Sequence, residues 1–458
     1  MRPRFKTLTP GRGVMDEGLF GYARAEDGAY IGYRVDGDGP IDIVQQPEWP
    51  GNIDLEWDDP WWAAWFGELA TIARVIAHDH RGVGVSSRNV SVPNLETRVS
   101  DLLCVLDRVK ATHPVMLGYL SSGAVNVLAA ATRPDLAQAI VWLEPSARYA
   151  WAQDYPWGSS WEELDAELEH LRMWGTREYA RWFWETQMAT GNPMPESMFN
   201  AMIKQSRNAC TPDVARELSR IWYDTDVRAV LESVQTPTLL LAHEGRPDAI
   251  DEARYIAELM PNAELAVVPG AAWSIEGQRL FLDEIRRFIG VERPSPELDT
   301  VLSTVLFTDI VDSTERQAAL GDRKWKELIE RHHELVRDAL GRWNGVENDT
   351  AGDGFYATFE GPARAIKCAL EIVARVRDFG IEIRAGVHTG ECEIVDGKRA
   401  GLSVTTGARV ASKAGASQVL VSRTVKDLVA GSGLTFEDAG EHELKGVPDR
   451  WHLFRAVG

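Results

Sequence analysis

The chain has 458 residues, which is longer than a single hydrophobic core usually stabilises, so we expect two or three domains. Its 69 acidic and 49 basic residues give a formal net charge of -20, which repels phosphate backbones and argues against a nucleic-acid partner. No apolar run is long enough to span a membrane, and the N-terminus lacks the apolar core of a signal peptide, so we expect a cytoplasmic protein. The four cysteines, Cys104, Cys210, Cys368 and Cys392, form no CxxC pair and predict free thiols.

The N-terminal part alternates short apolar runs with stretches of helical pattern. The runs read IDIVQQ, RVIAHD, PVMLGYL, QAIVWLEP, PTLLLAHEG and AELAVVPG. This alternation predicts an α/β fold with a mainly parallel sheet and helices on both faces. Residues 150–225 interrupt it with a Trp-rich helical segment. Its Trp rings suit two arrangements, the packed core of a cap or the lining of a pocket for an apolar or aromatic ligand.

Two motifs in this part resemble the α/β-hydrolase fold over roughly residues 20–290. DHRGVGVSS (79–87) resembles the turn after the fourth strand, and LGYLSSGAVNVLAAATRPDL (117–136) resembles the nucleophile elbow. The resemblance implies a catalytic triad, but Leu120 stands where the nucleophile belongs and Trp273 where the general base belongs. Triad members act as a unit, so their joint loss predicts a catalytically inactive domain.

The remaining polar residues near the elbow leave one alternative open. Arg246 aligns best with the triad acid, and Asp248 lies two residues further on. Ser121, Ser122 and His243 form a conceivable displaced catalytic set, or they are ordinary elbow and strand-end residues. A small apolar or aromatic ligand bound beneath the Trp-rich cap, without turnover, is the function that this reasoning leaves to the domain.

Two prolines in IGVERPSPELDT mark a break in the chain. We therefore place the hydrolase-like domain at residues 1–290, with its cap at about 150–225, a linker at 291–300 and a second domain at 301–458. The second domain opens with LFTDIVDST, an apolar strand that ends on Asp309 and is followed by a long amphipathic helical pattern.

The next segment, VENDTAGDGFYATFEG, has two short apolar runs that turn on Gly352-Asp353-Gly354. This pattern predicts a hairpin with a carboxylate at its tip. Asp309 at a strand end and Asp353 at the hairpin tip form the kind of carboxylate pair that holds hard divalent cations beside phosphate oxygens.

Five motifs in order closely resemble the class III nucleotidyl cyclase catalytic domain over almost all of residues 300–458. They are LFTDIVDST, TAGDGFYATF, IRAGVHTGE, VTTGARV and HELKGV. The resemblance implies an α+β domain with a ferredoxin-like core that works as a head-to-tail homodimer, with its active sites between the two subunits. The whole chain resembles bacterial fusions of a hydrolase-like domain to one cyclase domain.

The same resemblance assigns the metal and phosphate residues. Asp309 and Asp353, with the backbone carbonyl of Ile310, would bind two Mg²⁺ or Mn²⁺ ions. Lys445 would neutralise the triphosphate of ATP, and Arg409 would stabilise the transition state; both would come from the opposite subunit.

Three positions depart from the family pattern. Thr405 replaces the asparagine that orients the ribose. Asp349 and Lys398 replace the lysine and the aspartate that read adenine, as if the two had exchanged places. Outside the site, Asp312 is expected to cap the helix that begins near Ser313.

We therefore expect an adenylyl cyclase that converts ATP to cyclic AMP and pyrophosphate and is regulated by its N-terminal domain. Asp349 and Thr405 keep a second possibility open, a nucleotide-binding pseudocyclase or ligand sensor without turnover. A serine hydrolase with a displaced triad is the third. The residues leave undecided the preference for ATP over GTP and the direction of regulation.

Overall fold

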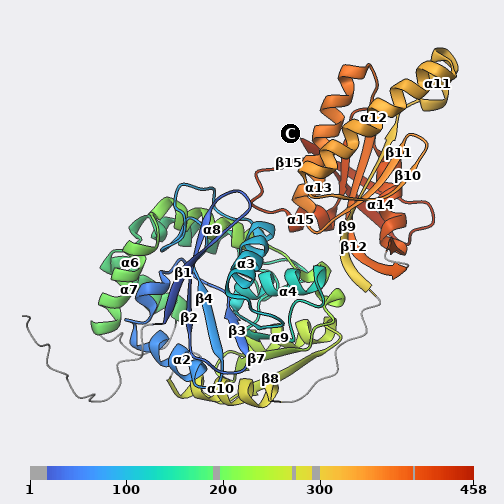
Figure 1. Ribbon diagram of the computed structural model, residues 1–458. Helices are drawn as coiled ribbons and strands as arrows, with labels where there is room; N and C mark the ends of the chain where they lie inside the picture. Colours follow the sequence, from blue (N-terminus) through green and yellow to red (C-terminus); the bar gives the residue numbers. More distant parts are fainter. Residues whose placement is uncertain (1–17, 189–195, 271–274, 291–299, 396–397, 458) are drawn as a thin grey trace, which may run out of the picture.

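The computed structural model describes residues 18–188, 196–270, 275–290, 300–395 and 398–457, and these residues form two eight-stranded sheets (Figure 1). Most of the linker expected at 291–300 lies outside the described residues. No helix among the described residues is both long and apolar enough to cross a bilayer. The four cysteines carry free thiols, as predicted.

The first sheet has the strand order β1-β2-β4-β3-β5-β6-β7-β8. Strands β1, β2 and β4 pair antiparallel, and β3 to β8 are parallel where they pair. The six apolar runs of the sequence correspond to β3 to β8, so the predicted parallel sheet is confirmed. The strands are β1 (Leu19–Arg24), β2 (Tyr30–Asp36), β3 (Asp42–Gln45), β4 (Arg74–His78), β5 (Val115–Tyr119), β6 (Ala139–Leu143), β7 (Thr238–His243) and β8 (Ala263–Val268).

Helices cover both faces of this sheet, because successive strand residues point to opposite sides. Val44 packs into one buried cluster with α3 and α4, and Ile43 packs into another with α2 and α10. The helices around the sheet are α1 (Ile53–Glu56), α2 (Pro60–Ala70), α3 (Leu95–Val109), α4 (Gly123–Thr132), α9 (Pro247–Leu259) and α10 (Ile275–Ile289).

The Trp-rich segment is helical, as predicted. It contains α5 (Trp161–His170), η2 (Leu171–Met173), α6 (Arg177–Phe183), η3 (Trp184–Met188), α7 (Glu196–Ala209) and α8 (Pro212–Asp224). Trp49, from the loop after β3, packs against Trp174 and Trp222 with ring centroids 5.9 and 5.1 Å apart. Packing of the cap core therefore accounts for Trp174 and Trp222, whereas Trp151 and Trp161 are 51% and 56% exposed.

The second sheet has the order β10-β11-β9-β12-β14-β16-β15, with β13 paired to β12. Only β12 and β14 pair in parallel; the other pairs are antiparallel. The strands are β9 (Thr300–Ile310), β10 (Val346–Ala351), β11 (Gly354–Phe359), β12 (Ile383–Val395), β13 (Lys398–Ala400), β14 (Val419–Ser422), β15 (Thr435–Glu443) and β16 (Arg450–Val457).

The helices of the second sheet divide between its faces. Those helices are α11 (Ser313–Leu320), α12 (Asp322–Arg342), α13 (Pro362–Arg375), α14 (Leu402–Lys413) and α15 (Arg423–Leu428). Residues of α12, α13 and α15 share a buried cluster with Leu306 and Ile310 of β9. On the other face α14 lies so close to β9 that a Cβ on Gly407 would meet Val305 at 2.4 Å. We call this second side the α14 face.

The predicted cap at Asp312 is wrong. Asp312 is the N-cap residue of α11, but its backbone is left-handed, with φ 55°, and its side chain makes no capping hydrogen bond. In this conformation the side chain does not reach the first-turn N–H groups that a capping side chain accepts from.

Candidate functional site

The two predicted metal aspartates lie beside each other at one end of the second sheet. Asp309 is the penultimate residue of β9, and Asp353 lies in the turn between β10 and β11. The N–H of Ile310 donates to Asp353 Oδ2 at 3.2 Å, which ties the hairpin tip to the end of β9. Gly352 adopts φ +63°, a left-handed conformation that allows this tight turn.

Arg384 on β12 contacts one of these aspartates. The sequence reasoning did not single it out as a site residue. It is the antiparallel partner of Asp309, and its guanidinium donates to Asp309 Oδ2 at 3.0 Å from Nε and 2.5 Å from Nη2. The signal was present in IRAGVHTGE, since Arg384 lies within that motif on the neighbouring strand. A guanidinium bound to a carboxylate fixes its orientation and adds positive charge beside it.

A histidine holds the hairpin from the side. His333 Nε2 lies 3.0 Å from the carbonyl oxygen of Gly352, and its ring packs edge-on against Phe355 with centroids 5.0 Å apart. The long helix α12 thus braces the turn that carries Asp353.

The two carboxylates suit divalent cations in part. Oxygen ligands at a strand end and a hairpin tip match hard cations, and the Ile310 carbonyl ends the same strand. Among the described residues no group of three or more His, Cys, Asp or Glu side chains gathers as a ready metal site. Further ligands would have to be phosphate oxygens or water.

A second, cationic group lies around a hollow of about 770 Å³. Arg409 on α14 and Lys445 in the loop from β15 to β16 both line it, and Arg409 Nε donates to the Lys445 carbonyl oxygen at 3.0 Å. Lys413 and Arg450 add two more cations, against the acids Glu443 and Asp449. An anionic ligand such as a triphosphate suits this surplus of positive charge.

Thr405 lies one helical turn before Arg409 on α14, so the two side chains share one side of the helix. Thr405 is exposed, and its hydroxyl donates to the Gly401 carbonyl oxygen at 3.4 Å. No hydrogen bond or ion pair among the described residues joins this cationic group to Asp309 or Asp353. Within the described residues of one chain, the two carboxylates and the cationic group are thus not joined directly.

Within one chain, no hydrogen bond or ion pair of the described residues joins Asp349 to Lys398, the two residues expected to read the base. Asp349 on β10 is exposed and accepts from the Thr350 N–H at 3.0 Å, while Lys398 is exposed at the start of β13. The two elements nonetheless meet through Tyr356, which lies opposite Asp349 and donates its hydroxyl to the Arg399 carbonyl oxygen at 3.0 Å.

The elbow of the first sheet has the backbone conformation of a nucleophile elbow but carries no nucleophile at Leu120. Leu120 has φ 47°, the left-handed conformation of a strand-to-helix elbow, and its carbonyl oxygen accepts from Trp142 Nε1 at 2.6 Å. A carboxylate from the loop after β3 occupies the donors beside it. Glu48 accepts from the Ser122 N–H at 2.7 Å and from the Ser121 hydroxyl at 3.3 Å.

Comparison with known proteins agrees with both halves. Residues 295–455 match the family model of the adenylate and guanylate cyclase catalytic domain, and residues 49–276 match that of the alpha/beta hydrolase fold. The chain therefore joins an α/β-hydrolase-fold domain to a cyclase catalytic domain.

Individual relatives cover one half each. An uncharacterised protein of Mycobacterium tuberculosis is 30% identical over 150 residues, 32% of this chain, and the match spans only 52% of that relative. A probable esterase of Oryza sativa subsp. japonica is 26% identical over 208 residues, 44% of this chain and 73% of the relative. An esterase from Exiguobacterium antarcticum has a TM-score of 0.52 at 18% identity, over 60% of this chain and all of that structure, which supports the hydrolase fold alone.

Among the described residues, no hydrogen bond joins Ser121 or Ser122 to His243. His243 is fully buried and places Nδ1 2.7 Å from Glu144 Oε1. The Ser122 hydroxyl donates to the Tyr119 carbonyl oxygen at 2.8 Å. The His243 ring is therefore paired with Glu144, and the Ser122 hydroxyl is bound to the backbone of the elbow.

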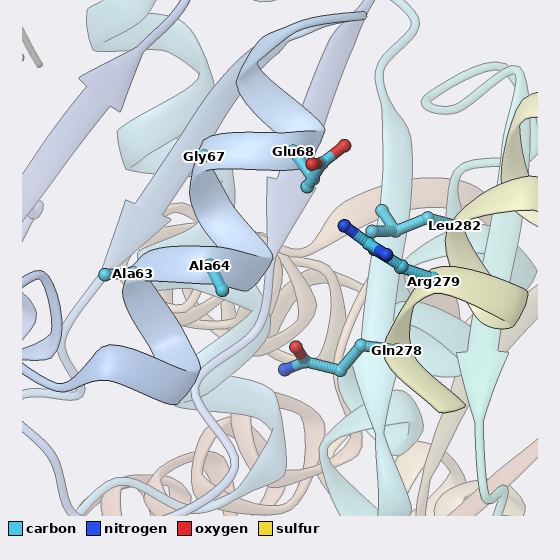
Figure 2. Close-up of a pocket in the computed structure, with 7 residues that line it drawn as sticks. All are labelled: Ala63, Ala64, Gly67, Glu68, Gln278, Arg279 and Leu282. Atoms are coloured by element: carbon cyan, nitrogen blue, oxygen red, sulfur yellow. The ribbon is translucent and has the colours of Figure 1, made fainter. Parts of the chain in front are cut away.

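The sequence aligned Arg246 with the triad acid and Trp273 with the general base. Arg246 is ion-paired with Asp248, Nη2 to Oδ2 at 2.9 Å, so the two neutralise each other instead of orienting a histidine. Trp273 lies outside the described residues. A hollow of about 260 Å³ between α2 and α10, with Gln278 and Arg279 across from Ala64 and Glu68 of α2, contains none of the predicted site residues (Figure 2).

The surroundings of Glu48 change its acidity. Protein packs around this partly exposed carboxyl closely enough that lost hydration raises its pKa to about 7, despite the opposing effects of the Ser122 N–H and Arg98. His78 and His80 lie near Arg98 and are buried, which lowers the pKa of both; that of His78 falls to about 4. The surroundings of Glu48 thus include the buried guanidinium of Arg98 on α3 and two buried imidazoles, one at the end of β4 and one just after it.

Proposed function

We propose that the chain is a nucleotidyl cyclase that converts ATP to cyclic AMP and pyrophosphate at a homodimer interface, with the hydrolase-fold domain as its regulatory module. The observation that carries this proposal is the division of charge within one chain. The carboxylates Asp309 and Asp353 lie at one place and the cations Arg409 and Lys445 at another.

A second copy offers the missing half of each site. In a two-fold dimer every contact occurs twice, so a head-to-tail pair that brings the carboxylates of one subunit to the cations of the other forms two sites. Gly407 of α14 approaches the side of β9 that carries Val305, and strand alternation puts Asp309 on that same side. The α14 face therefore bears residues of both half-sites, as a shared interface requires.

The residues then have distinct roles. Asp309, Asp353 and the Ile310 carbonyl would hold two Mg²⁺ or Mn²⁺ ions, which supply activation of the ribose 3′-hydroxyl and neutralisation of the leaving pyrophosphate. Arg384 keeps the Asp309 carboxylate oriented by two charge-assisted hydrogen bonds.

The partner's cationic half-site handles charge on the nucleotide. Lys445 would neutralise the triphosphate, and Arg409 would stabilise the charge that grows on the phosphoryl oxygens in the transition state. Thr405, on the same side of α14 as Arg409, would donate one hydrogen bond to the ribose in place of an asparagine. Asp349 and Lys398 would face the base as an acceptor and a donor.

One observation favours a second candidate function. The ion pair between Arg384 and Asp309 uses an oxygen that a metal ion would otherwise bind. If that pair persists with nucleotide present, the domain binds nucleotide without turning it over.

The deciding experiment is turnover. Purified protein with Mn²⁺ and ATP or GTP should form the cyclic nucleotide, ATP giving the faster rate by a modest factor. Nucleotide binding without any cyclic product would support the second candidate and overturn the first.

The regulatory role has a matching test on the first domain. Leu120 supplies no nucleophile, and Glu48 already binds the Ser122 N–H, so we expect no hydrolysis of simple acyl esters, even from Leu120→Ser. Ester turnover lost on Ser121→Ala or Ser122→Ala would instead support the displaced-triad hydrolase.

A further inference from the structure

The two domains touch through an acidic residue that caps a helix of the other domain. Glu96 in the first turn of α3 accepts from the Ala363 N–H at 2.9 Å. Ala363 lies in the first turn of α13, whose own N-cap residue, Gly361, has no side chain to offer. An N-cap acceptor that is normally local is thus supplied by the hydrolase-fold domain.

An ion pair strengthens the same contact. Arg364 Nε lies 3.5 Å from Glu96 Oε1, and Arg364 Nη2 donates to the Ser100 hydroxyl at 3.2 Å. Only 13% of the Glu96 side chain is exposed, so water screens the pair less than it would a surface pair.

The space around Gly361 fits this contact. A Cβ added there would lie 2.1 Å from Glu96 Oε1. Gly361 has φ -142°, an extended conformation that any residue adopts, so close approach rather than backbone freedom calls for glycine.

Apolar packing forms the second part of the surface. Leu302 at the start of β9 and Leu428 at the end of α15 are each 2% exposed. Both belong to the buried cluster that contains residues of α3, α4 and η4 (Arg228–Ser233) in the hydrolase-fold domain. Figure 1 shows β9 and β12 turned toward α4 where the two domains meet. The two domains therefore share part of one core.

The elements that make this surface also reach the two candidate sites. Helix α3 presents Glu96 to the cyclase domain and shares a buried cluster with α4, whose N-cap residue is Ser122 of the elbow. Strand β9 runs without interruption from Leu302 in the shared core to Asp309. Helix α13 packs on β9 through the cluster that contains Ile366 and Ile310.

We propose that this surface, made by Glu96 with the first turn of α13 and by Leu302 and Leu428 with the shared core, is a fixed dock that couples the elbow to the metal-binding end of β9. It uses the α13 and α15 side of the cyclase sheet and leaves the α14 face open for a second copy. The coupling rests on the proposed cyclase function; the dock itself does not.

The test loosens the dock without touching either half-site. Gly361→Ala places a methyl group against Glu96, and Glu96→Ala removes the cap and the ion pair together. The matched control is Gly341→Ala in α12, where an added Cβ meets nothing within 4 Å. Hydrogen–deuterium exchange in full-length protein is followed for peptides over residues 361–367 and 95–101, beside the cyclase rate with Mn²⁺ and ATP.

We expect both dock variants to raise exchange in these two segments at least about tenfold and to change the cyclase rate severalfold, with the control unchanged. Unaltered exchange in both variants would refute the dock. Faster exchange with an unaltered rate would refute the coupling and leave the dock in place. Faster exchange in a protein that forms no cyclic nucleotide would support the dock and count against the proposed function alone.

A double-mutant cycle asks whether the elbow is the other end of the coupling. Glu48→Gln keeps the acceptor at the elbow and removes its charge. Combined with Gly361→Ala, it should change the rate by a factor at least about threefold different from the product of the single effects. Multiplicative effects would exclude the elbow from the coupled unit.

Discussion

Arg384 and Asp309 face each other across the antiparallel pair of β12 and β9, and both side chains are 38% exposed. The guanidinium contacts one carboxylate oxygen through two nitrogens. The pair thus stays accessible to a ligand while it fixes the direction of the carboxylate that heads the candidate metal site.

Arg384 should therefore matter more for nucleotide than for metal. Arg384→Ala removes a cation beside the phosphate site and frees Asp309, so the KM for ATP should rise about tenfold while Mn²⁺ binding stays as tight or becomes tighter. Arg384→Lys keeps the positive charge but loses the two-nitrogen contact of the guanidinium. Its KM for ATP should lie between those of the wild type and Arg384→Ala. Weaker Mn²⁺ binding in Arg384→Ala would show that the arginine supports the metal instead. Initial rates against ATP and against Mn²⁺ give both constants.

The three aspartates around this strand end allow a matched comparison. Asp309→Asn and Asp353→Asn each replace a proposed metal ligand by a neutral amide of the same shape, so cyclase activity should fall at least about a hundredfold. Asp312→Asn is the control, because its side chain makes no capping bond and asparagine tolerates its left-handed backbone. Substantial activity in either of the first two variants, with native thermal stability, would remove the metal assignment.

Shared sites predict complementation between inactive variants. In a mixture of Asp309→Asn with Arg409→Ala protein, a heterodimer contains one site with both defects and one intact site. At equal amounts with free exchange, about a quarter of the wild-type activity should return. Absence of recovery, after subunit exchange is verified with labelled protein, would contradict a site made by two subunits.

Much of this architecture follows from local sequence signals. The six apolar runs became β3 to β8, and the GDG hairpin brought Asp353 beside the end of β9 because neighbouring strands fix the register. The left-handed elbow persists at Leu120 although leucine gains nothing from that conformation. A local motif is enough to predict the strands, the hairpin tip and the elbow, since each depends on residues close in sequence, whereas the contact between Asp353 and Ile310 joins residues 43 apart.

The missed features depend on contacts between distant residues. Glu48 and Ser122 are 74 residues apart, and Glu96 and Ala363 are 267 apart. Neither glutamate has a motif of its own, so no pattern marked it. The wrong cap at Asp312 has another cause, because the preference of aspartate for N-caps does not reveal the backbone conformation that decides whether its side chain reaches the helix.

Glu48 gives the hydrolase-fold domain a predicted pH dependence. Its folded pKa of about 7 is raised above the ordinary value of 4.5. The folded state therefore holds a proton that the unfolded chain has already released. This contribution to the free energy of unfolding is full below about pH 4.5 and is lost as the pH rises through about 7. The raised pKa values of Glu56 and Glu252, also about 7, act in the same direction.

Glu48→Gln should remove one part of that decline. The free energy of unfolding of the variant, relative to that of the wild type, should increase as the pH rises from about 5.5 to about 8. The variant Glu217→Gln, at an exposed position in α8, should match the wild type at both pH values. Chemical denaturation across this pH range measures the difference. A wild-type and Glu48→Gln difference that stays constant with pH would mean that Glu48 is ionised throughout.

The last prediction concerns Asp349 and Lys398, which the sequence resemblance aligns with a lysine and an aspartate of the cyclase family. Both are exposed and neither contacts the other, but Tyr356 and Arg399 bring their two strands together on one side of the sheet. An acceptor and a donor in exchanged positions fit adenine poorly, and a weakened polar readout costs about 1–3 kcal/mol of discrimination per hydrogen-bonding pair. We therefore expect only a modest preference for ATP over GTP. Asp349→Ala should cost much less activity than Asp309→Asn.

The double variant Asp349→Lys with Lys398→Asp restores the family order at unchanged net charge. Its ATP selectivity, measured as the ratio of kcat/KM values for ATP and GTP, should therefore exceed that of either single variant. Selectivity no better than that of the single variants would show that the two residues do not read the base as a pair.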